Sequence, residues 1–157
     1  MLYFNERPNN HNVTKALIRL NKNWLARRLQ KHFDEIRVQL EVWKPTHILF
    51  IRGEAVSADF LLALKDKTPL CKLVFYNADS FQNNPNPLQL LPYFDKVFTF
   101  DRNDAKRLGL NYLPLFFEDS YLTADYQKDL DFSFIGTIHS DRLRVVESIN
   151  RQLNPQN

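Results

Sequence analysis

The sequence predicts an α/β protein built on a Rossmann-like, doubly wound parallel sheet. Short apolar segments alternate along the chain with segments whose apolar residues recur every three or four positions, which is typical of alternating strands and helices. The apolar segments are continuous rather than interrupted by polar residues, which favours parallel strands covered on both faces. Polar and small residues follow directly after these segments, where ligands of parallel sheets bind.

We expect strands at residues 2–4, 47–51, 72–76 and 96–100, with the last three side by side in one parallel sheet. A helical spacing of apolar residues predicts one long helix from Thr14 to Lys44, which Pro45 ends. The residues that form this spacing are Leu25, Leu29, Phe33, Ile36, Leu40 and Trp43. Further helices are expected at residues 57–65, 88–94 and 103–108, and the Asn- and Pro-rich residues 83–87 predict a loop.

Composition excludes several classes of protein. A chain of 157 residues with 44% hydrophobic content can bury a real core, and its three glycines are too few for a glycine-rich phosphate loop. Cys71 has no second cysteine to pair with, and its apolar neighbours favour a buried structural thiol over a nucleophile. No metal site is expected. The apolar stretches are far shorter than the roughly 20 residues of a membrane span, and the start lacks a signal peptide, so we expect a cytoplasmic location.

Residues 129–142 carry the most information. Phe132 and Phe134 belong to an apolar segment that predicts a strand, and Gly136 permits a tight turn after it. Ser140 and Asp141 then predict the cap of a helix. The helix has apolar residues at helical spacing, namely Leu143, Val146, Ile149 and Leu153. A strand, a glycine turn and a helix start in this order are typical of a site for a nucleotide-type ligand.

The order of several short motifs resembles that of the CgeB-like proteins of capsular and lipopolysaccharide biosynthesis, which look like glycosyltransferases of the GT-B type. The motifs are NERP at residues 5–8, KALIRL at 15–20, NADS at 77–80, FTFDRNDA at 98–105, LPLF at 113–116 and FIGTIHSDR at 134–142. The resemblance runs from about Tyr3 to the end of the chain, and the last motif is its most specific part. The family usually has an acidic residue at the position of Asn5.

The resemblance implies two Rossmann-like domains, of which the first receives the acceptor and the second binds a nucleotide-sugar donor. Residues 1–127 match the acceptor-side domain without its first strand–helix unit, and residues 128–157 match the start of the donor-binding domain. The polar stretch from Thr123 to Lys128 is the expected joint. The implied function of the full-length family is transfer of a sugar from a nucleotide-sugar to a polysaccharide or lipid-linked acceptor, without a cofactor. This chain would be a truncated member, and we expect it to be inactive alone.

Carboxylates at the expected strand ends are candidate catalytic residues. Glu54 follows Gly53 after one strand, and Asp79 follows the next strand. A carboxylate at the edge of a cleft can take the proton from an acceptor hydroxyl, so both are candidates for the general base, and Glu54 is the better of the two. Asp79, and Asp101 more readily, are also explained as helix caps or turn formers.

Four residues near the glycine turn are candidate substrate-binding residues. Gly136 and Thr137 form the turn, and His139 could donate a hydrogen bond to a donor phosphate or a sugar hydroxyl. Arg142 lies in the first turn of the expected helix, where a cation is disfavoured by the helix dipole, so it could bind a ligand anion. An ion pair with Asp141, or no role at all, would also explain Arg142.

Basic residues gather in the first half of the expected long helix. They interleave there with apolar residues and a tryptophan, and acidic residues appear only in the second half. A basic amphipathic helix of this kind, from Thr14 to Lys31, can lie on an anionic membrane face such as that of the inner membrane. A solvated basic face above a stripe that packs on the core is the alternative.

Two other classes of function remain open. One is a non-catalytic α/β binding or interaction module. A receiver-like module of this class would use Asp79 for regulation, although the acidic pair and the lysine of receivers are not evident. A nucleic-acid partner is not expected, because the net charge of +3 is small and no aromatic sheet surface or helix-turn-helix motif is recognisable.

Overall fold

The computed structural model describes residues 1–119, 132–138 and 141–153. The chain divides into two compact units, residues 1–116 and 117–157, and each is described by itself. The predicted boundary between residues 127 and 128 and the predicted joint around it lie outside the described residues.

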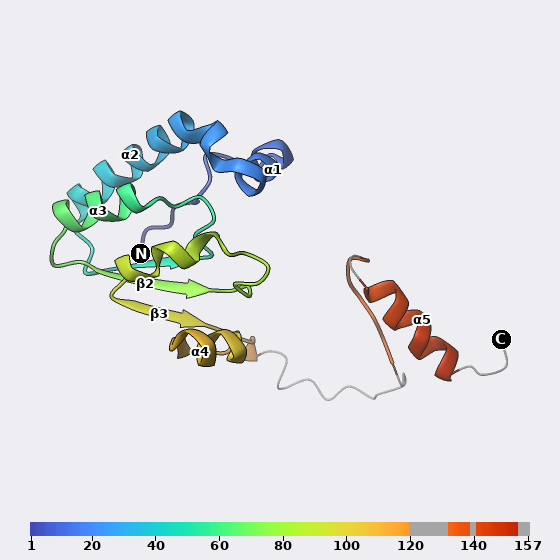
Figure 1. Cartoon of the computed structure of the whole chain (residues 1–157). Helices are drawn as coiled ribbons and strands as arrows, with labels where there is room; N and C mark the ends of the chain where they lie inside the picture. The colour runs from blue at the N-terminus through green and yellow to red at the C-terminus, as the bar shows by residue number, and fades with distance from the viewer. Residues whose placement is uncertain (120–131, 139–140, 154–157) are drawn as a thin grey trace. The chain divides into compact units, whose positions relative to one another are not determined.

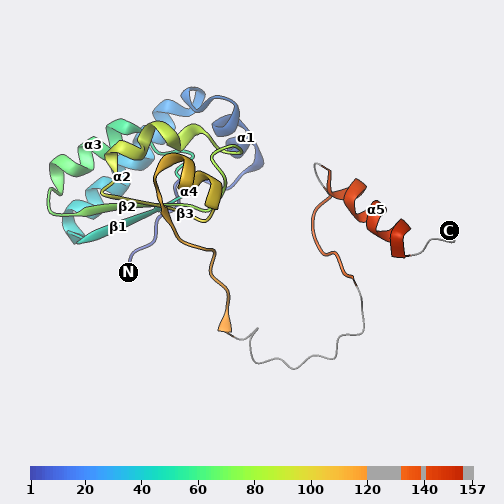
Figure 2. The same ribbon diagram turned by 60° about the horizontal axis from the view of Figure 1, so that its bottom comes forward.

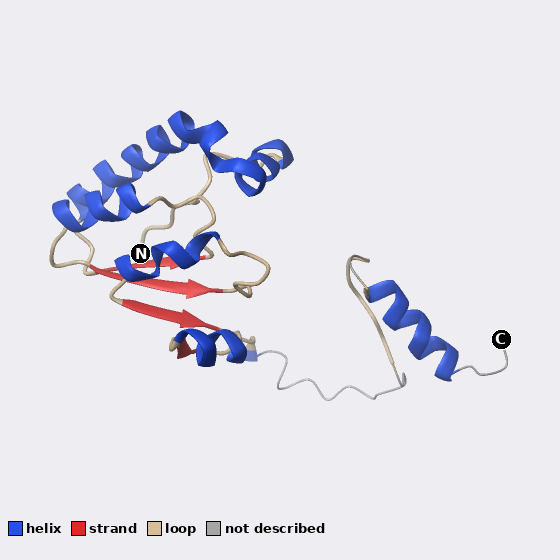
Figure 3. Ribbon diagram, in the orientation of Figure 1, coloured by secondary structure: helices blue, strands red, loops and turns tan. Residues whose placement is uncertain are grey.

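The first unit is an α/β structure with one all-parallel sheet of four strands in the order β1-β2-β3-β4 (Figures 1 and 3). Its elements are α1 (Asn12–Asn21), the 3-10 helix η1 (Lys22–Leu25), α2 (Ala26–Trp43), β1 (His47–Ile51), α3 (Ala58–Lys67), β2 (Lys72–Asn77), the 3-10 helix η2 (Asn86–Tyr93), β3 (Lys96–Thr99), α4 (Arg102–Leu108) and β4 (Asn111–Tyr112). The predicted α/β class is therefore confirmed.

The register confirms that the three predicted strands lie side by side in parallel. Ile48 is opposite Leu73 across β1 and β2, and Phe75 is opposite Val97 across β2 and β3. The short strand β4 was not predicted, because two polar or aromatic residues give no apolar segment. It pairs with β3 through Thr99, whose carbonyl also accepts a hydrogen bond from the Leu113 amide at 2.9 Å.

The core lies between one face of the sheet and the helices α2 and α3, which cover that face (Figure 2). Five phenylalanines form a continuous aromatic contact through it. The ring centroids of Phe33 in α2 and Phe60 in α3 are 4.5 Å apart. The ring centroid of Phe94 is 5.3 Å from that of Phe50 in β1 and 5.0 Å from that of Phe75, on which it stacks. Contacts of this geometry add about 0.5–1.5 kcal/mol per pair to the burial of apolar surface.

The opposite face of the sheet is open at β1. Leu49 and Ile51 alternate with the core residues of this strand, and both are more than half exposed. The expectation that both faces are covered is therefore wrong for β1. Right-handed crossovers between parallel strands that are added in one direction all lie on the same face of the sheet. The described strands follow each other in the order β1-β2-β3-β4 without a change of direction, so their connections leave the other face open. The doubly wound arrangement stays a prediction.

The predicted helix from residue 14 to residue 44 is two helices with a 3-10 turn between them. Asn21 ends α1, because its backbone is extended and its side chain accepts a hydrogen bond from the Asn23 amide at 3.0 Å. An asparagine side chain that bonds its own backbone in this way competes with the helical hydrogen bonds. The other end was predicted correctly: α2 stops at Trp43, and Lys44 is left-handed directly before Pro45.

One further prediction about local structure was wrong: residues 2–4 form no strand, although Phe4 packs against the core. The short helix predicted at residues 88–94 is present as the 3-10 helix η2, in which Pro92 has no amide hydrogen to donate to an α-helical bond. Among the described residues, no helix has the length and apolar character needed to cross a membrane.

In the second unit the structure describes residues 117–119, 132–138 and 141–153, and the last range contains the helix α5 (Arg142–Leu153). The predicted helix is confirmed, but the predicted strand at residues 132–135 is wrong, since these residues have no regular structure. A strand needs a neighbour for its backbone groups, and the described part of this unit contains no second strand. No residue of α5 is buried, and Ile135 is almost fully exposed.

Candidate functional site

A tight turn follows β1 and positions the first group of polar residues. Arg52 and Gly53 both have left-handed backbone conformations, with φ of 72° and 65°. A Cβ atom at Gly53 would lie 2.8 Å from the ring of Phe75, so only glycine fits there. A left-handed arginine costs about 1–2 kcal/mol, and backbone strain of this kind gathers at functional sites. The turn therefore marks the carboxyl end of β1 as a candidate site.

Glu54 is buried directly after this turn and is bound by two arginines. Its Oε2 accepts a hydrogen bond from Arg7 Nη2 at 2.8 Å, and its Oε1 accepts one from Arg52 Nη2, also at 2.8 Å. Only 6% of the Glu54 side chain is exposed. Because each carboxylate oxygen faces one guanidinium, Glu54 is best placed to hold the two arginines in position.

Asp79 lies at the end of β2 and is linked to Glu54 through Arg52. Its Oδ2 is 3.7 Å from Arg52 Nη2, while its Oδ1 accepts hydrogen bonds from the Ser80 amide and from Asn83 Nδ2. About a third of the Asp79 side chain is exposed. The structure thus brings the two predicted carboxylates to one guanidinium, and Asp79 is the more accessible of the two.

The N-terminal segment brings two more charged residues to the same place. The carbonyl of Asn5 accepts a hydrogen bond from His32 Nε2 at 2.8 Å, which ties the segment to α2. Glu6 and Arg7 follow, with 3.6 Å between Glu6 Oε1 and Arg7 Nη2. Burial raises the pKa of Glu6, the Arg7 charge opposes that rise, and the Glu54 charge adds to it. We call the set Glu6, Arg7, Arg52, Glu54, Asn77 and Asp79 the carboxyl-edge cluster.

Unpartnered polar atoms gather in this cluster. Within the described part of the chain, every buried side-chain nitrogen or oxygen without a hydrogen-bond partner belongs to one of four of its residues. The atoms are Glu6 Oε2, Arg7 Nε, Arg52 Nε, and both Nδ2 and Oδ1 of Asn77. Asn77 is fully buried and follows Tyr76, whose partner across the sheet is Ile51. Buried polar groups are normally paired, so their concentration here makes this edge of the sheet the candidate ligand site.

The sequence indicated only part of this cluster. Glu54 and Asp79 were predicted as site residues, whereas Arg7, Arg52 and Asn77 were not. A charged residue directly after an apolar strand, in the order Arg-Gly-Glu, is a signal that could have identified Arg52. No local signal marks Arg7, because it meets Glu54 from 47 positions away.

Other predicted polar residues have structural tasks. Asp101 caps α4, as its Oδ1 accepts hydrogen bonds from the amides of Asn103 and Asp104. Asp104, which was not singled out, is buried, and its Oδ2 accepts a hydrogen bond from the Phe81 amide at 2.8 Å. Cys71 is buried, and burial raises the pKa of its thiol, which fits a structural cysteine.

Three of the four predicted substrate-binding residues lie in the described part of the second unit. Arg142 Nη1 donates a hydrogen bond to the Thr137 carbonyl at 3.2 Å, so these two residues are brought together. Gly136 lies close to Phe134, whose ring a Cβ atom would meet at 3.3 Å. His139 lies outside the described residues, as does Ser140.

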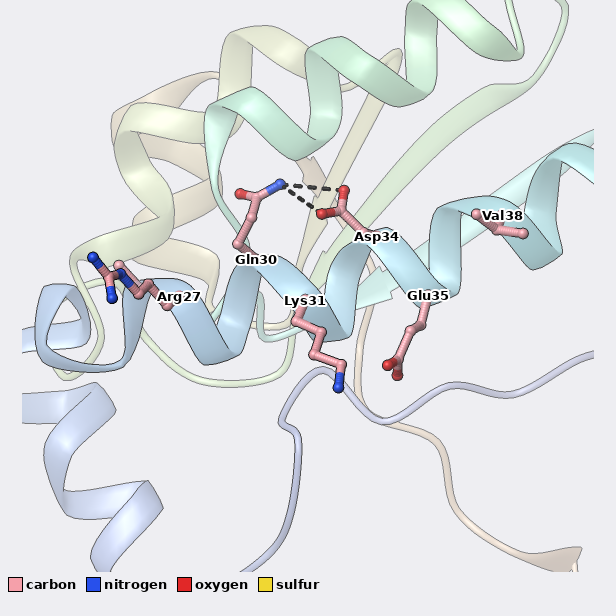
Figure 4. A pocket seen from close by; sticks show the side chains of 7 residues that line it. Arg27, Gln30, Lys31, Asp34, Glu35 and Val38 are labelled. Atoms are coloured by element: carbon pink, nitrogen blue, oxygen red, sulfur yellow. Dashed lines mark hydrogen bonds between the residues drawn. The ribbon is translucent and has the colours of Figure 1, made fainter.

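A shallow hollow on the surface of α2 is not a comparable site. Its lining residues come from this one helix, from Ala26 to Val38. Figure 4 shows Gln30 and Asp34 on one side of the helix, where Gln30 Nε2 donates to both carboxylate oxygens of Asp34, and Lys31 and Glu35 on another. A hollow between side chains of one exposed helix cannot enclose a ligand.

Within the described residues, no group of three or more histidine, cysteine, aspartate or glutamate side chains is arranged to hold a metal ion. Comparison of the chain with protein-family models, with curated proteins and with solved structures gives no match.

Proposed function

We propose that the chain is the acceptor-side part of a GT-B glycosyltransferase of capsular or lipopolysaccharide assembly, and that the carboxyl-edge cluster binds a sugar acceptor. The observation that carries the proposal is the concentration of buried, unpartnered polar atoms at the carboxyl ends of β1 and β2. Ligands of parallel α/β sheets bind outside these ends. The motif order from residues 5–8 to residues 134–142 supplies the family.

The charges of the cluster favour sugar hydroxyls over a phosphate. Three carboxylates, Glu6, Glu54 and Asp79, face two guanidinium groups, so the formal charge is negative when all are ionised. A phosphate would be repelled by the excess carboxylate, whereas sugar hydroxyls can donate to it. The Nδ2 and Oδ1 of Asn77 have no partner but are fully buried, so the carboxylate that a hydroxyl can reach is Asp79, about a third of which is exposed.

In this proposal Asp79 acts as the general base, and Glu54 positions the arginines. The proton of an acceptor hydroxyl passes to the Asp79 carboxylate as the hydroxyl oxygen attacks the anomeric carbon of the donor. The bond from that carbon to the nucleotide breaks, and the nucleoside diphosphate leaves with its electron pair. General-base assistance of this kind contributes roughly 10²–10⁴-fold to a rate. Gly136, Thr137, His139 and Arg142 remain proposed contacts of the nucleotide-sugar.

A second candidate is a non-catalytic sugar-binding module. Both carboxylate oxygens of Glu54 accept hydrogen bonds from arginines at 2.8 Å, so Glu54 is not free to act as a base. Asp79 is then the one candidate base of the cluster, and without its participation the cluster would bind a ligand and catalyse nothing. The two candidates differ in the second unit. A glycosyltransferase part should show at least millimolar affinity for a nucleotide-sugar that Arg142→Ala weakens, whereas a binding module should show none.

A glycan array tests the acceptor site. The full chain should bind a subset of bacterial surface glycans, and Arg52→Ala should abolish that binding because it removes the link between Glu54 and Asp79. Asp66→Asn, which changes an exposed carboxylate of α3, is the matched control and should bind like the unmodified chain. Binding that survives Arg52→Ala, or the lack of any glycan binding, would contradict the proposal.

A further inference from the structure

The exposed face of α1 carries an apolar stripe. Val13, Ala16 and Leu20 are spaced three and four residues apart on one side of the helix, and all three are exposed. Thr14 and Ile18 are buried and hold the helix to the rest of the unit. Trp24 in the following 3-10 helix η1 is also exposed, with 66% of its surface accessible. Figures 1 and 2 show α1 at the margin of the first unit, beyond the start of α2.

Basic residues are frequent in α1 and in the segment that follows it. Residues 11–33 contain six lysines and arginines and no acidic residue, although the whole chain has a formal charge of only +3, so the rest of the chain is net acidic. Four of the six basic side chains are exposed, namely Arg19, Arg27, Arg28 and Lys31. None of these four forms an ion pair within the described residues.

The structure changes which residues of the predicted basic helix can reach a partner. Lys22 is directed inward, since its Nζ donates to the Val56 carbonyl at 3.1 Å and burial lowers its pKa. Ile18 is part of the core, and Leu25 packs against it. Val13 and Leu20 take the place of these two as exposed apolar residues.

We propose that exposed residues of α1, η1 and the start of α2 together bind an anionic lipid membrane. The apolar residues are Val13, Ala16, Leu20 and Trp24, and the basic ones are Arg19, Arg27, Arg28 and Lys31. Exposed aliphatic residues and a tryptophan, flanked by unpaired basic residues, match the boundary between acyl chains and anionic headgroups. The surface takes part in no contact of the carboxyl-edge cluster, so this proposal does not depend on the proposed sugar site.

The pattern favours a membrane over other partners. A polyanion such as nucleic acid would bind the basic residues alone, and the aliphatic residues would stay exposed to solvent. A second copy of the chain would bring the same unpaired arginines together across a two-fold axis, where like charges repel. An anionic lipid surface satisfies both features at once.

Vesicle sedimentation tests the proposal with the full chain. The chain should bind vesicles of phosphatidylglycerol and phosphatidylcholine but not vesicles of phosphatidylcholine alone. Binding should weaken as the screening length falls from about 10 Å at 0.1 M salt to about 3 Å at 1 M salt. In a Trp43→Phe chain, the emission of Trp24 should shift to shorter wavelength on binding.

Matched variants separate the two features of the surface. The triple change Arg19→Gln, Arg27→Gln and Arg28→Gln should weaken binding on the order of a hundredfold, at about fivefold for each basic residue lost. Lys67→Gln, Lys96→Gln and Lys106→Gln make the same charge change at exposed positions elsewhere and should weaken it far less. Leu20→Ser with Trp24→Ser should abolish most of the sedimentation with anionic vesicles, and Leu62→Ser with Leu70→Ser, also exposed, should not.

Three results would overturn the proposal. Equal binding to neutral and anionic vesicles would show that the basic residues do not attract the membrane. Full binding by the Leu20→Ser, Trp24→Ser chain would show that the apolar residues do not contribute to it. Lipid-free dimerisation in an ultracentrifuge that the same double variant abolishes would assign the surface to a second copy instead.

Discussion

Arg7 and Glu54 lie 47 positions apart in the sequence and form an ion pair of 2.8 Å with almost no exposure of either side chain. The pair ties the N-terminal segment to the turn after β1, and Arg52 extends it to Asp79 at the end of β2. A contact this distant in sequence and this buried makes the carboxyl-edge cluster part of both the stability and the proposed function of the first unit.

Removal of Glu54 should be strongly destabilising. Glu54→Ala leaves the Arg7 guanidinium largely buried without its partner, and losses of one member of a buried pair cost about 3–5 kcal/mol. The free energy of unfolding in urea measures the effect. Asp66→Ala breaks the exposed pair with Lys67 and should cost no more than about 1 kcal/mol. Similar losses in the two variants would mean that the Glu54 pair contributes little.

Gly53→Ala and Gly109→Ala form a matched comparison of two left-handed glycines, both with φ of 65°. At Gly109 a Cβ atom meets no atom within 4 Å, so we expect only the conformational cost of about 1–2 kcal/mol. At Gly53 the Cβ atom also meets Phe75 at 2.8 Å, which adds roughly 1–3 kcal/mol of overpacking. Urea unfolding of both variants checks the difference, and equal costs would contradict the close approach.

The pH dependence of stability should differ in sign between Glu6 and Asp95. Burial raises the pKa of Glu6 in the folded chain above its pKa in the unfolded chain. The contribution of Glu6 to stability is therefore fully present below the unfolded pKa and is lost as pH rises through the folded pKa, because the buried carboxyl must then ionise. Glu6→Gln should therefore stabilise the chain at neutral pH and have less effect in acid.

Asp95 provides the opposite case. The hydrogen bond from the Leu73 amide lowers the pKa of Asp95, so its contribution is present at neutral pH and is lost as pH falls through the folded value. Asp95→Asn should destabilise the chain at neutral pH and have less effect in acid. Urea unfolding across the acid range measures both variants, and parallel pH profiles would contradict the assigned shifts.

The chain alone should not transfer sugar. Transfer needs donor and acceptor held together in reactive geometry, an advantage of about 7–11 kcal/mol, and the described part of the second unit is an exposed segment and one helix without a buried residue. Titration calorimetry with UDP-, GDP-, CMP- and dTDP-sugars should show weak binding at most, and a donor-hydrolysis assay should show no turnover. Micromolar affinity with hydrolysis would mean that the donor site is complete.

The sequence predicted the sheet well, because strands such as residues 47–51 and 96–99 owe their structure to local apolar runs and to flanking breakers. It failed where a side chain competes with the backbone, as Asn21 does between α1 and α2. It also failed at residues 132–135, an apolar run that has no neighbouring strand in the part of the chain that the structure describes. Glu54 and Asp79 could be predicted from their place after strands, but their arginine partners depend on long-range packing that no local pattern encodes.

The most direct test of the central claim follows the unpartnered atoms of the carboxyl-edge cluster by NMR. The side-chain amide of Asn77 and the Nε–H groups of Arg7 and Arg52 give separate signals in a ¹⁵N–¹H correlation spectrum. Titration with a glycan selected on the array should shift these signals, whereas UDP or inorganic phosphate should leave them in place. Signals that move with phosphate, or that stay unmoved by every glycan, would contradict a sugar site at this edge of the sheet.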